Sequence, residues 1–488
     1  MKTLISSTSE PAKLPTPIAL LTAVIAVLLA SLPACAAKFH KKYLDSGGFI
    51  SNTQLKSQLA ATTNAFFTAL DNGDGLLLVR TDLDGNVVWS HQYGDYRIKA
   101  PTLTLSNDGN LIAVAWSLGD LDAIAAKINA TTGDVVWSQR YPGMNEAFTV
   151  TRRGSKLILM GEKTYLNPLG DYLVKPIGIA IRESDGTVAW AKEYQEGTLD
   201  YLENFNHRIE SATVNPGTVT YTGRFYDAAL DPHGPDRRRI SLLTIDANTG
   251  LVPINAMHTY DLELTANDYA IETDSPFPWD ITRIKDAQGN DDGFALAGTY
   301  SHSDTYTFTA TDPVVLRVDS NGTPLWAMLY GSTNTFKGFG RSIRQNVYFN
   351  AGRLDLYTTW DQYTHAIDAS STVSGIIRIQ EVDGLPVGMA VYDAPDADFS
   401  GLCMTADGTG GYLAVAAEPV SPYSSFELIR VGQIGGGVDC YVDHPLELEE
   451  LIVDDDVVEI VPLDVDVEPR EFPLTWVDRP LTVTECDE

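Results

Sequence analysis

Residues 76–94 read LLLVRTDLDGNVVWSHQYG, which is two β-favouring runs separated by a short polar turn. The turn, residues 82–86, contains a glycine and an asparagine, which can take the positive φ angles that a tight hairpin needs. The valines, the tryptophan and the tyrosine that follow are residues enriched in strands. This stretch therefore predicts a β-hairpin.

The same pattern recurs along the chain. Anchored on the turn glycine, the copies lie at Gly85, Gly133, Gly186, Gly250, Gly322 and Gly384, at intervals of 48 to 72 residues. A tyrosine follows the glycine by eight residues in five copies and by ten at Tyr260, and a degenerate seventh copy occupies residues 426–437. A second hairpin pattern precedes each copy from Gly133 onward. We therefore expect an all-β protein, a β-propeller of seven four-stranded blades over residues 61–437.

The tryptophan of the repeat is expected to have a structural role. It stands four residues after the glycine at Trp89, Trp137, Trp190 and Trp326. A single blade cannot bury its own apolar faces, so blades must stack on one another. A large aromatic side chain at one repeat position fits packing between blades better than ligand binding.

The repeat resembles the Trp-docking repeats of PQQ-like propellers and the generic bacterial DxxGxxxW propeller repeats, most closely in KINATTGDVVWSQRY, residues 127–141. The resemblance implies an exported bacterial propeller, similar to the PQQ-like lipoprotein scaffold of the β-barrel assembly machine. Quinoprotein dehydrogenases add an adjacent cysteine pair and a calcium-bound cofactor. The sequence has no Cys-Cys pair and no matching acidic constellation, so no cofactor is expected.

The N-terminus has the pattern of a secretory signal, which we assign to residues 1–37. Lys2 and Lys13 precede an apolar run over residues 18–32, too short to span a bilayer. Export is expected, to the periplasm, the outer membrane or the extracellular space. Two alternatives stay open: lipidation of Cys35 in a lipobox, which would be the only membrane attachment, or ordinary cleavage at residues 36–37. A lead-in follows at residues 38–60. Either this lead-in or the region after Gly437 is expected to close the ring.

Acidic residues outnumber basic ones by 65 to 34, giving a net charge of −31. Such a chain repels the phosphate backbone, so nucleic acid is excluded as a partner. Nearly half of this charge lies in residues 438–488, where Val, Ile and Leu alternate with carboxylates. The alternation predicts an acidic C-terminal β-rich appendage that packs on the propeller or pairs with another subunit.

Export also predicts oxidised cysteines. Cys403 lies in a probable inner strand and is interpreted as a buried apolar residue. Cys440 and Cys486 bracket the acidic appendage, and we predict that they form a disulfide. The bond would close a loop of about 46 residues and so hold a segment that repels itself.

The known catalytic motifs are absent. The chain has no G-x-S-x-G elbow, phosphate loop, H-E-x-x-H or C-x-x-C-H sequence, and its eight histidines are scattered. No metal site is expected, and catalytic residues cannot be assigned from the motifs.

Insertions instead point to one face of the ring. The long segments fall between the middle strands of blades, at residues 163–176, 227–239, 301–313, 361–374 and 419–425, and in the crossovers, at 195–207, 261–280 and 331–340. All of these connections emerge on the same rim, where loops on a rigid scaffold usually bind ligands. The candidate binding residues are Tyr165, Tyr172, Tyr201, Trp279, Tyr306, Trp360, Tyr363 and His365.

The sequence therefore favours a non-enzymatic binding or scaffold module for a protein or glycan partner at the cell surface. Two alternatives stay open: a propeller enzyme acting on saccharides, as hydrolase or lyase, and a PQQ-like oxidoreductase. A saccharide hydrolase needs two carboxylates about 5 to 9.5 Å apart. Asp200, Glu203, Asp280 and Asp361 are available on the looped face, and the acidic strands leave self-association open as well.

Overall fold

The structure is a computed structural model of the whole chain. Backbone contacts divide it into two units, Met1–Ala36 and Ala37–Glu488. No helix among the described residues is long and apolar enough to cross a membrane. The residues that the structure describes do not include Cys35, Cys440 or Cys486. The structure describes residues 39–45, 59–71, 75–94, 98–117, 121–166, 172–196, 206–215, 217–226, 238–264, 275–304, 308–332, 337–345, 352–363, 370–393, 398–404, 412–418, 424–431, 446–457 and 460–485.

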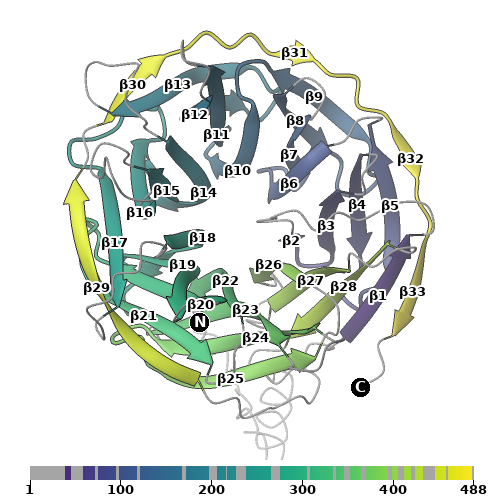
Figure 1. Cartoon of the computed structure of the whole chain (residues 1–488). Coiled ribbons are helices and arrows are strands. Elements are labelled where there is room, and N and C mark those ends of the chain that lie inside the picture. Colours follow the sequence, from purple (N-terminus) through teal and green to yellow (C-terminus); the bar gives the residue numbers. More distant parts are fainter. Residues whose placement is uncertain are drawn as a thin grey trace, which may run out of the picture. The chain divides into compact units, whose positions relative to one another are not determined.

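The second unit is an all-β propeller, in which antiparallel sheets stand around a central axis (Figure 1). In the described part of the chain, seven four-stranded units can be followed from the axis outward. Two of them share an additional outer strand and so belong to one nine-stranded sheet. The prediction of a β-propeller with four-stranded blades is confirmed.

The strands take four positions in the blades. The innermost strands are β2 (Leu59–Ala61), β6 (Ile98–Leu105), β10 (Glu146–Arg153), β14 (Asn206–Asn215), β18 (Ser275–Lys285), β22 (Lys337–Gln345) and β26 (Asp398–Met404). The second strands are β3 (Phe66–Asp71), β7 (Leu111–Ser117), β11 (Lys156–Leu166), β15 (Thr218–Tyr226), β19 (Asp291–Asp304), β23 (Arg353–Tyr363) and β27 (Tyr412–Glu418). The third strands are β4 (Leu76–Thr81), β8 (Asp122–Ile128), β12 (Tyr172–Arg182), β16 (Arg238–Asp246), β20 (Phe308–Val318), β24 (Ser370–Gln380) and β28 (Ser424–Val431). The fourth strands are β5 (Val87–Tyr93), β9 (Val135–Tyr141), β13 (Val188–Glu196), β17 (Met257–Leu264), β21 (Pro324–Ser332), β25 (Pro386–Asp393) and β1 (Phe39–Asp45).

The lead-in closes the ring at two places. Strand β1 pairs with β28 and becomes the fourth strand of the last blade, with Tyr43 opposite Phe426. Strand β2 pairs with β3 and becomes the innermost strand of the first blade. Residues from the beginning of the second unit therefore complete two different sheets, the first and the last of the ring.

The repeat tyrosines join each blade to the next. Tyr141 is fully buried, and its hydroxyl donates to the carbonyl oxygen of the turn glycine Gly186 at 2.8 Å. The same bond links Tyr43 to Gly85 (2.5 Å), Tyr93 to Gly133 (2.6 Å), Tyr194 to Gly250 (3.1 Å), Tyr260 to Gly322 (2.6 Å) and Tyr330 to Gly384 (2.8 Å). A Cβ at Gly133, where φ is 78°, would lie 2.2 Å from the His91 ring, so only glycine fits this contact.

The repeat tryptophans lie in the same seams. Trp137 Nε1 donates to the Glu183 carbonyl at 3.1 Å, and Trp326 Nε1 donates to the Glu381 carbonyl at 2.9 Å. Trp190 makes the equivalent bond to Ala247 at 3.3 Å. Trp89 packs against the core between the first two blades. Each of the four therefore contacts apolar or backbone groups of the blade wall.

The acidic C-terminal segment runs around the outside of the ring as a belt (Figure 1). We define the belt as residues 446–457 and 460–485, which contain the strands β29 (Leu446–Val457), β30 (Ile460–Asp464), β31 (Arg470–Glu471), β32 (Trp476–Asp478) and β33 (Leu481–Glu485). They pair antiparallel with β21 and β17, then β13, β9, β5 and β1 in turn. The strands that the sequence left free to pair with another subunit thus pair with outer strands of their own chain.

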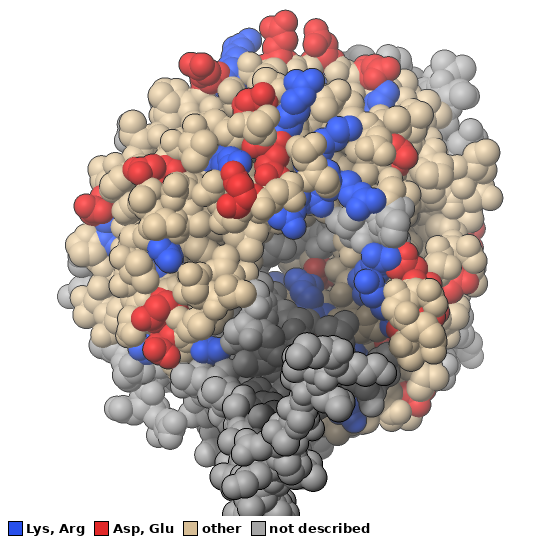
Figure 2. Space-filling view, turned by 180° about the vertical axis from the view of Figure 1, so that it is seen from behind, with Lys and Arg blue, Asp and Glu red and all other residues tan. Residues whose placement is uncertain are grey.

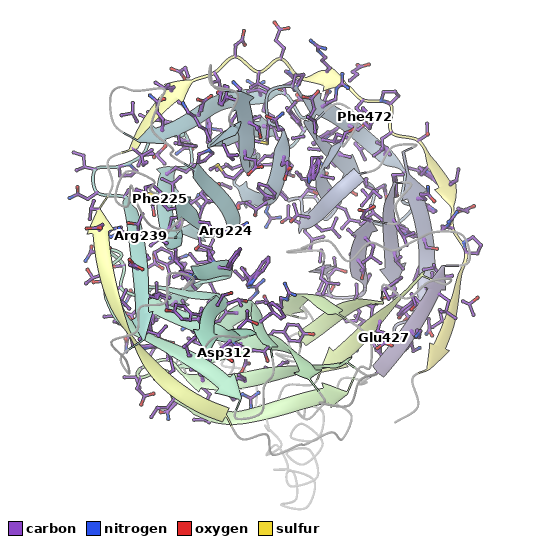
Figure 3. All side chains as sticks on the ribbon, in the orientation of Figure 1. Arg224, Phe225, Arg239, Asp312, Glu427 and Phe472 are labelled. Atoms are coloured by element: carbon purple, nitrogen blue, oxygen red, sulfur yellow. The ribbon has the colours of Figure 1, made fainter. Side chains whose placement is uncertain are left out.

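Apolar belt residues complete the cores between blades. Leu474 is 7% exposed and belongs to the core between the first two blades, and Val467 and Leu451 occupy comparable places further along. The labelled Phe472 lies on the belt at the outer rim (Figure 3). The belt therefore gains stability from hydrophobic burial, which compensates for the repulsion among its carboxylates.

Basic side chains of the outer strands contact carboxylates of the belt. Lys192 Nζ lies 2.5 Å from Asp464 Oδ1, and Arg239 Nη1 lies 2.6 Å from Asp456 Oδ2. His258 Nδ1 and His91 Nε2 approach Asp455 and Asp478 at 3.1 and 3.2 Å.

Candidate functional site

The two faces of the ring differ in their connections. In an antiparallel blade the two tight hairpin turns leave at one end, while the middle connection and the crossover leave at the other. We call these ends the hairpin-turn face and the long-loop face. The connections are shorter than the sequence predicted, because strand pairing continues further: β11 and β12 stay in register as far as Leu166 and Tyr172. The predicted 261–280 and 331–340 crossovers likewise contain the first residues of β18 and β22.

Five of the innermost strands share a β-bulge near the long-loop face: β10, β14, β18, β22 and β26. In β18 the register shifts between Pro278 and Asp280, so Trp279 is the extra residue, and in β22 the shift leaves Arg341 extra. The equivalent extra residues are Phe148 in β10, Glu210 in β14 and Ser400 in β26. A bulge releases a residue from the ladder and redirects its side chain, and such bulges occur often beside active sites.

Two of these bulge residues form a cluster of aromatic and guanidinium groups. The guanidinium of Arg341 lies 5.0 Å from the Trp279 ring centroid and 4.6 Å from that of Phe339. Trp279 stacks with Phe277 at 6.4 Å, and Arg224 of β15 covers Phe277 at 4.5 Å. We call these five residues the axial cluster; all are only partly buried.

The cluster belongs to three consecutive blades, and four of its five residues lie on the innermost strands β18 and β22. Arg224 lies near the inner margin of the ring (Figure 3), and its neighbour Phe225 is buried in the wall. Close backbone approach brings two of the blades together, since a Cβ at Gly340 would be 2.4 Å from the Gly298 carbonyl. Trp279 Nε1 donates to Thr299 Oγ1 at 2.8 Å, which fixes the indole. Rigid rings flanked by fixed cations form a platform for a flat, partly apolar and negatively charged ligand.

Asp280, one of the carboxylates considered for catalysis, is a structural residue. It is 7% exposed, and its Oδ2 accepts from Ser342 Oγ at 2.5 Å, from the Ile343 amide at 3.2 Å and from Arg344. Its Oδ1 accepts from the Ile281 amide at 2.9 Å. A carboxylate so fully hydrogen-bonded and paired joins β18 to β22 and is poorly placed to exchange protons.

Of the predicted binding residues, only Trp279 lies in the axial cluster. Tyr165 lies elsewhere, within one blade, where its hydroxyl contacts Glu193 and Lys163 Nζ lies 4.7 Å from its ring centroid. Tyr172, Trp360 and Tyr363 are on strands β12 and β23, and their side chains are not described. Outside the described residues are Tyr201, Tyr306, His365, Asp200 and Glu203.

Four members of the cluster were not predicted from the sequence. Phe277 and Phe339 were assigned to crossovers, and Arg224 and Arg341 to ordinary strands. An alternation of aromatic residues in Phe277-Pro278-Trp279 was the available signal, since period two is the strand pattern. The intervening prolines concealed it, although an innermost strand is a sheet edge and therefore tolerates proline. Among the described residues, no group of three or more His, Cys, Asp or Glu side chains is arranged to hold a metal ion.

No protein-family model matches the chain, and no curated protein matches its sequence. Solved structures do resemble it. An ulvan lyase of polysaccharide lyase family PL25 has a TM-score of 0.50 at 9% identity, covering 80% of this chain and 95% of its own. The polysaccharide lyase Uly1 has a TM-score of 0.48 at 8% identity, with 81% and 100% covered. An α-L-arabinanase from Penicillium chrysogenum, in complex with arabinobiose, has a TM-score of 0.38 at 11% identity. The match covers 82% of this chain and 99% of the arabinanase.

At this identity the likeness establishes the propeller fold, and nothing in it is specific to PQQ-like proteins. It also corrects two expectations from the sequence. A non-enzymatic binding or scaffold module was the favoured function, and an enzyme was held less probable. The finding that corrects them is that the similar solved structures include two polysaccharide lyases, an α-L-arabinanase and an α-L-arabinofuranosidase.

Proposed function

We propose that this protein is an exported enzyme that cleaves an acidic polysaccharide, and that its substrate lies over the axial cluster on the long-loop face. The observation that carries the proposal is the stacking of Arg224 and Arg341 on Phe277, Trp279 and Phe339 around the axis. The partly exposed rings offer apolar area to sugar rings, and arginine forms bidentate bonds with carboxylate or sulfate groups.

A lyase reaction fits these groups better than hydrolysis. In an elimination, a base removes the proton next to the sugar carboxylate, the bond to the leaving oxygen breaks, and that oxygen takes up a proton. The product carries a new carbon–carbon double bond. Arginines that pair with the carboxylate stabilise the negative charge that develops there, and this makes the proton easier to remove. Asp280 is engaged in the wall, so it does not supply the second carboxylate of a hydrolase pair.

Glu210 is our candidate for the proton-transfer group. It occupies the bulge position of β14, equivalent to Trp279 in the next blade and Phe148 in the preceding one. The recurrence of the bulge in neighbouring innermost strands supports a place at the same level of the axis. The choice rests on the backbone position, because the side chain of Glu210 is not described. A carboxylate can act as general acid or base.

Cleavage can be tested with a panel of purified polysaccharides: polygalacturonate, alginate, dextran sulfate and neutral dextran. We expect new chain ends only from polygalacturonate and alginate, which carry the sugar carboxylate that the elimination needs, together with the ultraviolet absorbance of unsaturated products. Dextran sulfate and neutral dextran should stay intact. Glu210→Gln should abolish cleavage while leaving the melting temperature unchanged, and Arg470→Gln on the belt is the matched surface control. Cleavage of dextran alone, or full activity in the Glu210 variant, would contradict the proposal.

Export remains part of the proposal. Residues 1–37 supply the signal, and mass spectrometry of the mature N-terminus distinguishes a diacylglyceryl Cys35 from a chain that begins at residues 36–38. A mature protein that retains residues 1–30 would exclude export.

A further inference from the structure

A second positively charged surface lies on the hairpin-turn face, the opposite end of the ring from the axial cluster. It is built by one blade, β10–β13. Arg153 is directly opposite Lys156 across the β10–β11 hairpin, and Lys156 is directly opposite Arg182 on β12. Residues directly opposite on antiparallel strands present their side chains on the same side of the sheet. Three cations therefore stand side by side on three adjacent strands, and we call them the basic row.

A fourth cation continues the basic row at the axis. Arg283 lies on the innermost strand β18, and burial, together with the nearby charge of Arg153, lowers its pKa. It forms an ion pair with Asp291. The back view of the ring shows several Lys and Arg side chains beside the central hollow, with Asp and Glu side chains among them (Figure 2). Positive charge is thus concentrated near the axis in a chain whose net charge is −31.

Within the basic row, Arg182 is exposed to solvent, and Arg153 and Lys156 are partly buried. Arg182 Nη1 donates to Thr187 Oγ1 at 2.8 Å, and Lys156 Nζ donates to the Asn248 carbonyl at 3.3 Å. Asp185 and Asp246 are the neighbouring carboxylates whose pKa these cations help to lower, alongside hydrogen bonds from Thr187 and Thr249. Like charges placed directly opposite in a sheet destabilise it, so the arrangement needs another explanation than stability.

We propose that the basic row binds an acidic polysaccharide chain, as an ancillary surface that holds the polymer on the face opposite to the site of cleavage. The choice of polymer rests on the proposed function, while the anion-binding surface rests on the register and charges alone. Adjacent strands are about 4.8 Å apart, so the row presents one cation per strand to a single extended chain. The acidic belt would repel a densely charged duplex, which favours a saccharide chain over nucleic acid.

The proposal predicts opposite effects on binding and stability. In Arg153→Gln/Arg182→Gln, two like-charged neighbours of Lys156 are lost. The melting temperature should therefore stay the same or rise at low salt. Binding to immobilised polygalacturonate or dextran sulfate should weaken about tenfold, because hydrogen bonds to charged groups are lost. A variant with the same change in net charge on the belt, Arg470→Gln/Arg479→Gln, should bind as the wild type does.

The measurement is the affinity of the full chain for these two polymers and for neutral dextran, at low and high salt. The proposal that the basic row binds a polymer would be overturned by unchanged affinity in the Arg153/Arg182 variant. It would also be overturned if the wild-type protein bound neither acidic polymer. Equal affinity for a DNA duplex would overturn its assignment to saccharides. Cleavage of a short acidic oligosaccharide separates the two proposals: the row variant should retain it. If that variant loses binding and no form of the protein cleaves the polymer, the result would support binding by the basic row and contradict the proposed enzymatic function.

Discussion

The outer wall of the ring and its axis are built in different ways. Along the outer wall the same contacts recur from blade to blade: a buried tyrosine donates to a turn glycine of the next blade, and a belt strand covers the seam. Along the axis the backbone recurs, as a bulge in successive innermost strands, but the bulged residue changes from Phe148 to Trp279 to Arg341. We therefore assign the contacts that recur from blade to blade to stability, and the bulge residues that differ between blades to function. Changes in the outer wall should therefore lower stability, and changes at the axis should lower activity.

The largest effect expected in the outer wall is that of the proposed disulfide between Cys440 and Cys486. Both cysteines lie outside the described residues. The first belt strand begins opposite Ser332 and the last ends opposite Lys41, on either side of the blade β22–β25. Closing a loop of about 46 residues stabilises the fold by roughly 4 kcal/mol. We expect Cys486→Ala to lower the midpoint of unfolding and reduction to do the same. Non-reducing peptide mapping checks the bond, and free thiols at both positions, or Cys403 paired with either, would disprove it.

Removing an apolar anchor of the belt should come next. Leu474 is 7% exposed in the core of the first seam, whereas Val477, three residues further on, is 59% exposed. Leu474→Ala should destabilise the protein by about 2 to 5 kcal/mol, because it removes buried methyl groups and leaves a cavity. Val477→Ala is the control and should change stability by less than about 0.5 kcal/mol. Equal small effects in denaturant unfolding would mean that the belt is not part of the core.

The inter-blade tyrosine bond should contribute less. Tyr194→Phe keeps the buried ring and removes the hydroxyl that donates to Gly250 O at 3.1 Å. A loss of about 1 kcal/mol is expected, since the buried carbonyl loses its partner. Val136→Ala, at a position 53% exposed on β9, is the control. Stability unchanged in Tyr194→Phe would show that the repeat tyrosine acts by packing alone.

The smallest effect should depend on pH. His91 is buried between Trp89 and Trp476, and this burial lowers its pKa below 6.5 despite the carboxylate of Asp478. The unfolded chain therefore binds a proton more readily, so stability is full above pH 6.5 and declines as the pH falls toward the folded pKa. His91→Gln should reduce this part of the acid sensitivity. Thermal unfolding at a series of pH values measures it, and identical pH profiles would refute the assignment.

What the sequence could predict follows the same division. The propeller and its hairpins could be predicted from the glycine-anchored repeat. Glycine is required at Gly133 and its equivalents because a neighbouring side chain approaches them closely. The axial cluster could not be predicted, because a β-bulge has no sequence pattern of its own. In addition, Pro276 and Pro278 are residues typical of loops. Asp280 looked like a candidate acid in the sequence because its partners are distant along the chain. Ser342 and Arg344 come next to it only in the fold.

The central claim is tested most directly by comparing two tryptophans, Trp279 at the axis and Trp326 in the wall. The measurement is the rate of cleavage of an acidic polysaccharide, with the melting temperature of each variant taken on the same sample. Trp279→Ala should lose at least about tenfold in rate with little change in melting temperature, as expected for a lost substrate contact. Trp326→Ala should lose about 3 to 5 kcal/mol of stability and keep its rate while folded. Wild-type cleavage by Trp279→Ala, or loss of activity in a folded Trp326→Ala alone, would contradict the division between wall and axis.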